Sequence, residues 1–127
     1  MKLTKSELEI MQVLWKAGRS LTRGEILSLS TEKSWKDSSI HILLNGMLKK
    51  QAIREDGFAR SGKVWARLYA PCVTMERYYG ETVFAESSPA AVPQLFSALL
   101  DRRDLTPELI AELRGMLDKR EQELDKP

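Results

Sequence analysis

Apolar residues in the first part of the chain recur at the three- and four-residue spacing of amphipathic helices. The first such segment begins at Thr4, whose hydroxyl forms with the Glu7 carboxylate the reciprocal pattern of a capping box. Gly18 is suited to end this helix because glycine enters the left-handed region at little cost. The predicted core-facing side of the helix consists of Leu8, Met11, Leu14 and Trp15.

Two further helices are predicted by the same criteria. Residues 22–25 repeat the capping pattern and open a short second helix that ends near Ser30. A third helix is expected from about Lys36 or Asp37 to Lys50. Its inward stripe consists of Ile40, Leu43, Leu44, Met47 and Leu48.

The periodicity changes after Ile53 from helical spacing to a strand pattern. Residues 53–58 and 64–70 read as two strands around the basic, glycine-containing turn 59–63, and Pro71 closes the second strand. Three helices followed by a hairpin with a positively charged tip is the order of a winged helix-turn-helix. The sequence therefore predicts a mostly α fold with a small β-hairpin.

The rest of the chain is predicted to be helical, with one break. A fourth helix is expected over residues 74–84, a linker or corner over 86–93, a short helix over 94–102, and a last helix from the Thr106 N-cap toward Asp125. The apolar side of the last helix consists of Leu109, Ile110, Leu113, Met116, Leu117 and Leu124.

That apolar side needs a partner, and a second copy of the chain is the simplest one, because two-fold dimers are the commonest oligomers. The alternative is that the last two helices fold back onto the N-terminal module. We divide the chain into a winged helix-turn-helix domain over residues 1–73 and a helical dimerisation region over 74–127.

Charge is distributed unevenly between these parts. Residues 1–73 hold 13 lysines and arginines against 7 acidic residues, a net charge of +6, whereas residues 74–127 have a net charge of -4. A basic module joined to an acidic tail favours a polyanion as partner of the first part only.

With 127 residues, one cysteine and one histidine, the chain leaves little room for catalysis. Cys72 and His41 together cannot supply a nucleophile, a base and an orienting group, so we expect no enzyme, no cofactor and no metal. No apolar run is long enough to span a membrane, and a cytoplasmic protein is the default expectation. We expect Cys72 to be a small buried side chain.

A helix-turn-helix sets outward residues of its third helix against base edges while flanking cations hold phosphates. The outward positions are Ser38, Ser39, His41, Ile42, Asn45, Gly46 and Lys49. The phosphate candidates are Lys36, Lys49, Lys50, Arg60, Lys63 and Arg67.

Several of these residues also have a purely structural interpretation. His41 lies one turn after Asp37 and fits a solvated surface residue with an acidic neighbour better than a DNA contact. Basic residues at the end of the third helix also complement the helix dipole. Trp35 and Trp65 fit core or hairpin anchors better than platforms for stacking bases. Gly46 costs about 1 kcal/mol in a helix and indicates either a close approach to DNA or a lost side chain.

The chain resembles the penicillinase repressor family of winged-helix transcriptional repressors, the BlaI/MecI/CopY group. The resemblance spans nearly the whole length. It rests on residues 3–15 (LTKSELEIMQVLW), the Leu48-Lys49-Lys50 end of the third helix, the Tyr69-Ala70-Pro71 exit from the hairpin, and Leu105-Thr106-Pro107-Glu108.

The resemblance implies a homodimer in which each third helix and wing binds one half of a near-palindromic double-stranded DNA operator. It places Ser39 where the family usually has a threonine, and Lys49 and Lys50 at the basic helix end. Three positions depart from the usual residues of the family. Ile42 replaces a polar residue, Gly46 replaces an arginine, and Gln51 replaces a glycine. The alternative is a winged-helix module that binds another protein and not DNA.

Two modes of control known in the family do not carry over. Residues 92–100 contain no asparagine, so cleavage of an Asn-Phe bond by a membrane-bound sensor protease has no counterpart, and any sensor or protease partner stays unknown. The chain also lacks the C-terminal cysteines of the copper-responsive members. The sequence does not identify the operator, the target genes or the inducer.

Overall fold

The computed structural model describes residues 1–126, with Val83 described by its backbone only, and it forms two compact units. The first unit covers Met1–Glu86 and the second begins at Ser87. Each unit is described by itself below. Within residues 1–126, no helix combines the length and the apolar content needed to cross a membrane.

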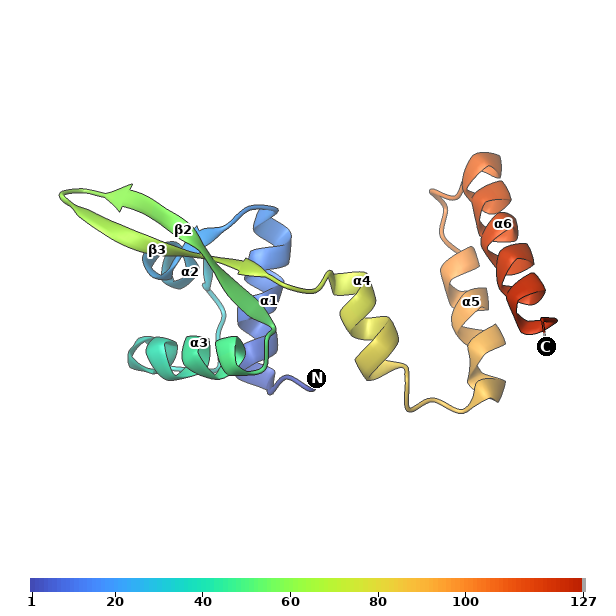
Figure 1. Cartoon of the computed structure of the whole chain (residues 1–127), viewed down its shortest axis with the longest axis horizontal. Helices are drawn as coiled ribbons and strands as arrows, with labels where there is room; N and C mark the ends of the chain where they lie inside the picture. Colours follow the sequence, from blue (N-terminus) through green and yellow to red (C-terminus); the bar gives the residue numbers. More distant parts are fainter. Residues whose placement is uncertain (127) are drawn as a thin grey trace. The chain divides into compact units, whose positions relative to one another are not determined.

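The first unit contains the three predicted helices in the predicted order (Figure 1). Helix α1 spans Lys5–Ala17 and α2 spans Arg23–Leu29, and both begin with a complete capping box. A 3-10 turn, η1 (Asp37–Ser39), leads into α3 (Ile40–Lys49). Gly18 ends α1 in the left-handed region with φ 67°, as its position after the apolar stripe predicted.

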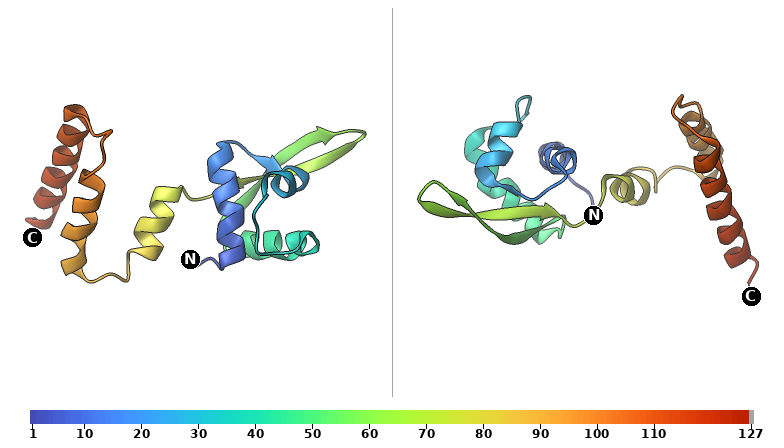
Figure 2. Two further views of the ribbon diagram at one scale, coloured as in Figure 1. Left: turned by 180° about the vertical axis from the view of Figure 1, so that it is seen from behind. Right: turned by 90° about the horizontal axis from the view of Figure 1, so that it is seen from above.

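A three-stranded antiparallel sheet completes the winged helix. The short strand β1 (Leu21–Thr22) pairs with β3 (Val64–Pro71), which pairs in turn with β2 (Ile53–Ser61). The hairpin of β2 and β3 extends beyond the helices in each view and forms the wing (Figure 2). The strands are longer than predicted because a bulge between Glu55 and Phe58 lets the pairing continue toward the tip.

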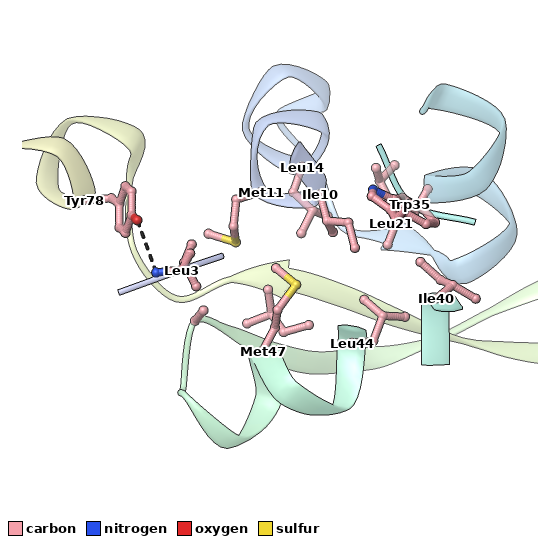
Figure 3. Close-up of a cluster of buried hydrophobic side chains, with 13 residues drawn as sticks. Leu3, Ile10, Met11, Leu14, Leu21, Trp35, Ile40, Leu44, Met47 and Tyr78 are labelled. Carbon is pink, nitrogen blue, oxygen red and sulfur yellow. Dashed lines mark hydrogen bonds between the residues drawn. The ribbon is translucent and has the colours of Figure 1, made fainter. Parts of the chain in front are cut away.

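The core lies between α1, α3 and the base of the sheet. Ile10, Met11 and Leu14 of α1 meet Leu44 and Met47 of α3, and all five are almost fully buried (Figure 3). Removing such side chains from water is the main favourable term in folding, about 1.5 to 3 kcal/mol each. The predicted stripes thus supply Met11, Leu14, Leu44 and Met47, whereas Ile10 replaces Leu8 and Trp15, which are only half-buried, at the centre of the α1 face.

The fourth helix belongs to the first unit. Helix α4 (Met75–Tyr78) continues as a π-helical turn, η2 (Tyr79–Val83), within the range predicted for one regular helix. Buried Tyr78 accepts a hydrogen bond from the Leu3 backbone N–H at 3.3 Å, and Tyr78 and Tyr79 both lie near the Trp15 ring. The compact unit therefore ends at residue 86 and not at 73, because these aromatic side chains pack on α1.

This boundary reduces the charge asymmetry without removing it. Residues 1–86 hold 14 basic and 10 acidic residues, and residues 87–127 hold 6 and 8, so the net charges are +4 and -2. The acidic residues 76, 81 and 86, together with Arg77, account for the change, because the sequence division had counted them with the tail. The first unit keeps the excess of positive charge.

Two local predictions are wrong. Cys72 is exposed, because it follows the end of β3 and contributes only its backbone N–H to Ala52. The break between the units is also shorter than expected: after the 3-10 turn η3 (Pro89–Ala91), helix α5 (Val92–Leu100) already begins at Val92. A proline in the first helical turn loses no hydrogen bond, so Pro93 permits this early start.

The second unit consists of α5 and α6 (Pro107–Leu124), which form a helical hairpin (Figure 1). The Thr106 hydroxyl accepts a hydrogen bond from the Leu109 N–H at 3.2 Å, and Pro107 occupies the first turn, as predicted. A hollow of about 250 Å³ between the helices is lined by apolar side chains that include Phe96, Leu100 and Leu113. Leu113 is half-buried, whereas five other predicted dimer residues are exposed: Leu109, Ile110, Met116, Leu117 and Leu124.

Candidate nucleic-acid interface

A groove of about 560 Å³ lies between the start of α2, helix α3 and the wing. Each of these elements contributes polar or basic side chains to its wall. The lining residues include Arg23, His41, Asn45, Trp65, Arg67 and Tyr69. Segments far apart in the sequence thus form one concave surface that joins the recognition helix to the wing.

The outward residues of α3 lie along one side of this groove. His41 and Asn45 line it, and both side chains are exposed. Ile42 projects into solvent with 76% of its surface exposed. Ser38 and Lys49 are also exposed, whereas Ser39, at the junction of η1 and α3, is half-buried. A hydroxyl, an amide and an imidazole at these positions can all exchange hydrogen bonds with base edges.

Arg23 is a groove residue that was missing from the sequence prediction. Its guanidinium lies within hydrogen-bond distance of the His41 imidazole Nε2. Asp37, the acidic neighbour expected for His41, instead pairs with Lys33 at 2.7 Å. A cation in the first turn of a helix opposes the helix dipole, and this local mismatch was the available signal that Arg23 serves another purpose.

The wing brings its three predicted cations into different surroundings. Lys63 is exposed at the tip, next to Gly62 with φ 64°. Arg67 forms an ion pair with Glu55 at 2.8 Å. The Arg60 guanidinium lies over the Trp65 ring, 5.6 Å from its centroid, and its Nε donates to the Gly62 carbonyl at 3.3 Å.

The two tryptophans considered as anchors differ. Trp35 is buried between α2 and α3, and Lys33 lies over its ring at 5.3 Å. Trp65 is 64% exposed, so it is no core residue. Its register opposite Arg60 near the end of the hairpin places it beyond the reach of the helices that cover the base of the sheet.

Lys50, predicted as a phosphate contact, has a structural partner. Its Nζ donates to the Glu7 carboxylate at 2.5 Å and to the Lys2 carbonyl at 3.2 Å. Glu7 is 5% exposed and also accepts from the Thr4 N–H at 2.9 Å. Burial alone would raise the pKa of the Glu7 carboxyl, but the hydrogen bonds from Lys50 and Thr4 and the Lys50 charge hold its pKa below the usual value.

The same carboxylate explains Gly46. A Cβ built at Gly46 would lie 3.2 Å from the Glu7 Oε2 atom, closer than most such contacts. Gly46 therefore faces α1 and not the outside, which corrects its place among the outward residues. The absence of a side chain leaves room for the carboxylate that holds Lys50.

Lys36 and Lys49 remain exposed cations at the two ends of the recognition element. Lys36 precedes η1, and Lys49 is the last residue of α3. Within residues 1–126, neither these two lysines nor Lys63 at the wing tip forms an ion pair. In the same part of the chain, no three His, Cys, Asp or Glu side chains come together in a way that could hold a metal ion.

Comparisons with known proteins agree with this geometry. The penicillinase repressor family model matches residues 3–119, which covers both units. An uncharacterised 16.5 kDa protein from the ptsI 3′ region of Latilactobacillus sakei is 25% identical over 116 residues, which are 91% of this chain and 78% of that protein. The chain belongs to the penicillinase repressor family, whose members are winged-helix, DNA-binding transcriptional regulators and not enzymes.

Proposed function

We propose that this protein is a dimeric repressor that blocks access to a promoter by occupying a near-palindromic operator. In each half-site, α3 lies in the major groove and the wing lies over the flanking backbone. Two binding domains related by a two-fold axis then cover half-sites about one helical turn, or a multiple of it, apart. Repression by occupancy requires no chemistry beyond binding.

The observation that carries this proposal is the groove between α2, α3 and the wing. A duplex backbone is a curved polyanion, and it fits a concave surface rimmed by exposed cations better than a flat one. Arg23 and Arg67 contribute positive charge to the groove wall, and Asn45 supplies both a donor and an acceptor on α3. Lys36, Lys49 and Lys63 are further exposed cations on the recognition element and the wing.

The second unit supplies the dimer contact in this proposal. Met116 and Leu117 are more than half exposed, and Leu109, Ile110 and Leu124 continue the apolar surface along α6. A second copy of α5 and α6 offers the same surface, and a two-fold axis brings the two together. The partner of this surface is therefore the same chain, which also gives the operator its symmetry.

Selection of duplexes from a random pool, followed by sequencing, tests the proposal. We expect enrichment of a palindrome with half-sites about 10 base pairs apart or a multiple of this. Neutralising about 6 to 8 phosphates per dimer predicts a slope of roughly -5 to -7 for log K against log salt concentration. Affinity that is independent of salt, or a pool without enrichment at low salt, would contradict it.

One observation favours a second candidate, a winged-helix module that binds another protein. Ile42, on the outward side of α3, is the most exposed large apolar residue among the side chains that the structure describes. A protein partner would bury it, and Ile42→Ser would then weaken that complex. In the repressor, the same change would instead alter preference at one base pair, because Ile42 is placed to contact a thymine methyl group.

A further inference from the structure

The wing exposes aromatic side chains that the contacts described so far do not explain. Phe58 is 61% and Trp65 64% exposed, although burying each ring would be favourable. In the antiparallel register, Phe58 lies opposite Arg67 and Arg60 opposite Trp65. Directly opposed residues share one face of a sheet, so these four side chains lie on the same side of the wing.

That side of the wing is the one that faces the groove. Trp65, Arg67 and Tyr69 line the groove together with His41 and Asn45 of α3. Tyr69 continues the same alternation toward the base of the hairpin, where Ile53 is buried in the core. Of the two exposed rings, Trp65 therefore lies in the groove wall, on the surface that meets a duplex bound to α3.

Arg60 is held differently from the other cations of the wing. Its guanidinium lies over the Trp65 ring and its Nε donates to Gly62, so its position is fixed by stacking and by a backbone carbonyl. Within the described residues it forms no ion pair, whereas Arg67 is paired with Glu55. The Arg60 side chain is exposed, and an arginine keeps its full positive charge.

We infer that the stacked pair of Arg60 and Trp65 reads the narrow minor groove of A·T-rich sequence beside the bases contacted by α3. This inference rests on the proposed function and adds a determinant of specificity to it. The hairpin extends beyond the helices (Figure 2). With α3 in the major groove, a hairpin of this reach extends toward the adjacent minor groove. A·T tracts narrow that groove and deepen its negative potential, which favours an inserted arginine.

Arginine on a tryptophan suits this task better than the lysine at the tip. A guanidinium is planar and weakly hydrated, so it loses little hydration energy when it enters a narrow groove. The stack on Trp65 already orders the Arg60 side chain, so binding costs little additional conformational entropy. Lys63 carries a compact, strongly hydrated charge on a flexible stem and is suited to contact phosphates. The stacked pair thus distinguishes flanking sequences by the width of the minor groove, whereas Lys63 strengthens binding to all flanking sequences alike.

Three versions of the selected duplex test the inference, each with the central half-sites kept and the flanks replaced. The flanks are A·T pairs, G·C pairs, or inosine·C pairs, which offer the major-groove groups of G·C without the guanine amino group in the minor groove. We expect the A·T and inosine·C duplexes to bind at least about fivefold more tightly than the G·C duplex in fluorescence anisotropy at fixed salt.

Variants show whether the stacked pair causes the preference. Trp65→Ala and Arg60→Lys should bring the A·T to G·C affinity ratio close to 1, because both weaken binding to the A·T and inosine·C duplexes more than binding to the G·C duplex. Lys63→Ala is the matched control: it should weaken binding to all three duplexes equally and leave the ratio unchanged. Thermal denaturation of each variant verifies that the wing change leaves the fold intact.

The outcomes separate the inference from the proposed function. Salt-dependent binding without a flank preference, inosine·C flanks that behave like G·C flanks, or a ratio that survives Trp65→Ala would overturn the inference and leave the repressor proposal standing. A protein that binds none of the duplexes, or enriches none from the random pool, would overturn both.

Discussion

Lys49 and Lys50 are neighbours in the sequence, but their side chains have different surroundings. Lys49 ends α3 in solvent, whereas Lys50 lies at the Glu7 carboxylate, 2.5 Å from Oε1. The helix pattern alone made both residues equal candidates for phosphate contacts. Which of the two lysines forms an ion pair with α1 depends on how α1 packs against α3, and this packing is seen only in the tertiary structure.

This difference gives opposite expectations for two alanine variants. Lys50→Ala leaves a buried carboxylate without its cation and should lower the free energy of unfolding by about 1 to 3 kcal/mol. Lys49→Ala should change that free energy by less than about 0.5 kcal/mol but weaken DNA binding for every sequence. Urea unfolding and anisotropy with the selected duplex check both, and equal effects on stability would contradict the assignment.

The Glu7 carboxylate also predicts a pH dependence. Its pKa is lower in the folded protein than the usual value, so the folded state binds fewer protons and the ionised group stabilises the fold above that usual value. The stabilisation is lost as the pH falls through the lowered pKa.

Glu7→Gln removes this contribution. The variant should be less stable than the natural protein at pH 7, and the difference should shrink between about pH 5 and pH 3. Urea unfolding across this range measures it. Other carboxylates, such as Glu25 and Asp56, also have lowered pKa values and titrate in both proteins, so only the difference reports on Glu7. A difference that stays constant with pH would contradict the prediction.

At the scale of elements, the capping residues predicted where helices begin. Thr4, Thr22 and Thr106, the predicted caps, each accept a hydrogen bond from a backbone N–H three residues later. Thr74, which was predicted only as the first residue of a helix, caps α4 in the same way. These signals are local, so they can be read from a few adjacent residues. The association of α4 with α1 is not local, and the sequence division at residue 73 therefore missed it.

Two tyrosines of this region form a matched pair of tests. Tyr78→Phe removes the buried acceptor of the Leu3 N–H and should lower the free energy of unfolding by about 1 kcal/mol. Tyr79→Phe removes a contact with Gln12 at 3.4 Å on the exposed side and should cost less than about 0.5 kcal/mol. Urea unfolding of the full chain measures both, and a larger cost at Tyr79 would show that α4 is fixed by other contacts.

At the scale of the whole molecule, DNA binding and dimerisation are assigned to separate units. A single winged helix contacts one half-site, and its affinity rises when a second domain is linked to it, because the second contact becomes intramolecular. In this proposal the exposed apolar side of α6 is what links them. The strength of repression then depends on the dimer as much as on the recognition helix.

Leu117→Glu tests this link. A charge in the centre of the apolar surface of α6 should convert the dimer to a monomer in sedimentation equilibrium and weaken operator binding by at least about tenfold. Gln122→Glu introduces the same charge at another exposed position of the helix and should leave the dimer intact. A dimer that persists in Leu117→Glu would place the subunit contact elsewhere.

The sequence by itself determined the helices, their inward stripes and the wing, because capping and periodicity act between residues close in the chain. It also identified the family through residue motifs in α1, at the end of α3, at the exit from the hairpin and at the start of α6. The tertiary structure alone decided which surface residues are occupied: Lys50 by Glu7 and His41 by Arg23. Such pairs join different elements, and their side chains meet only after α1, α2 and α3 have packed around one core.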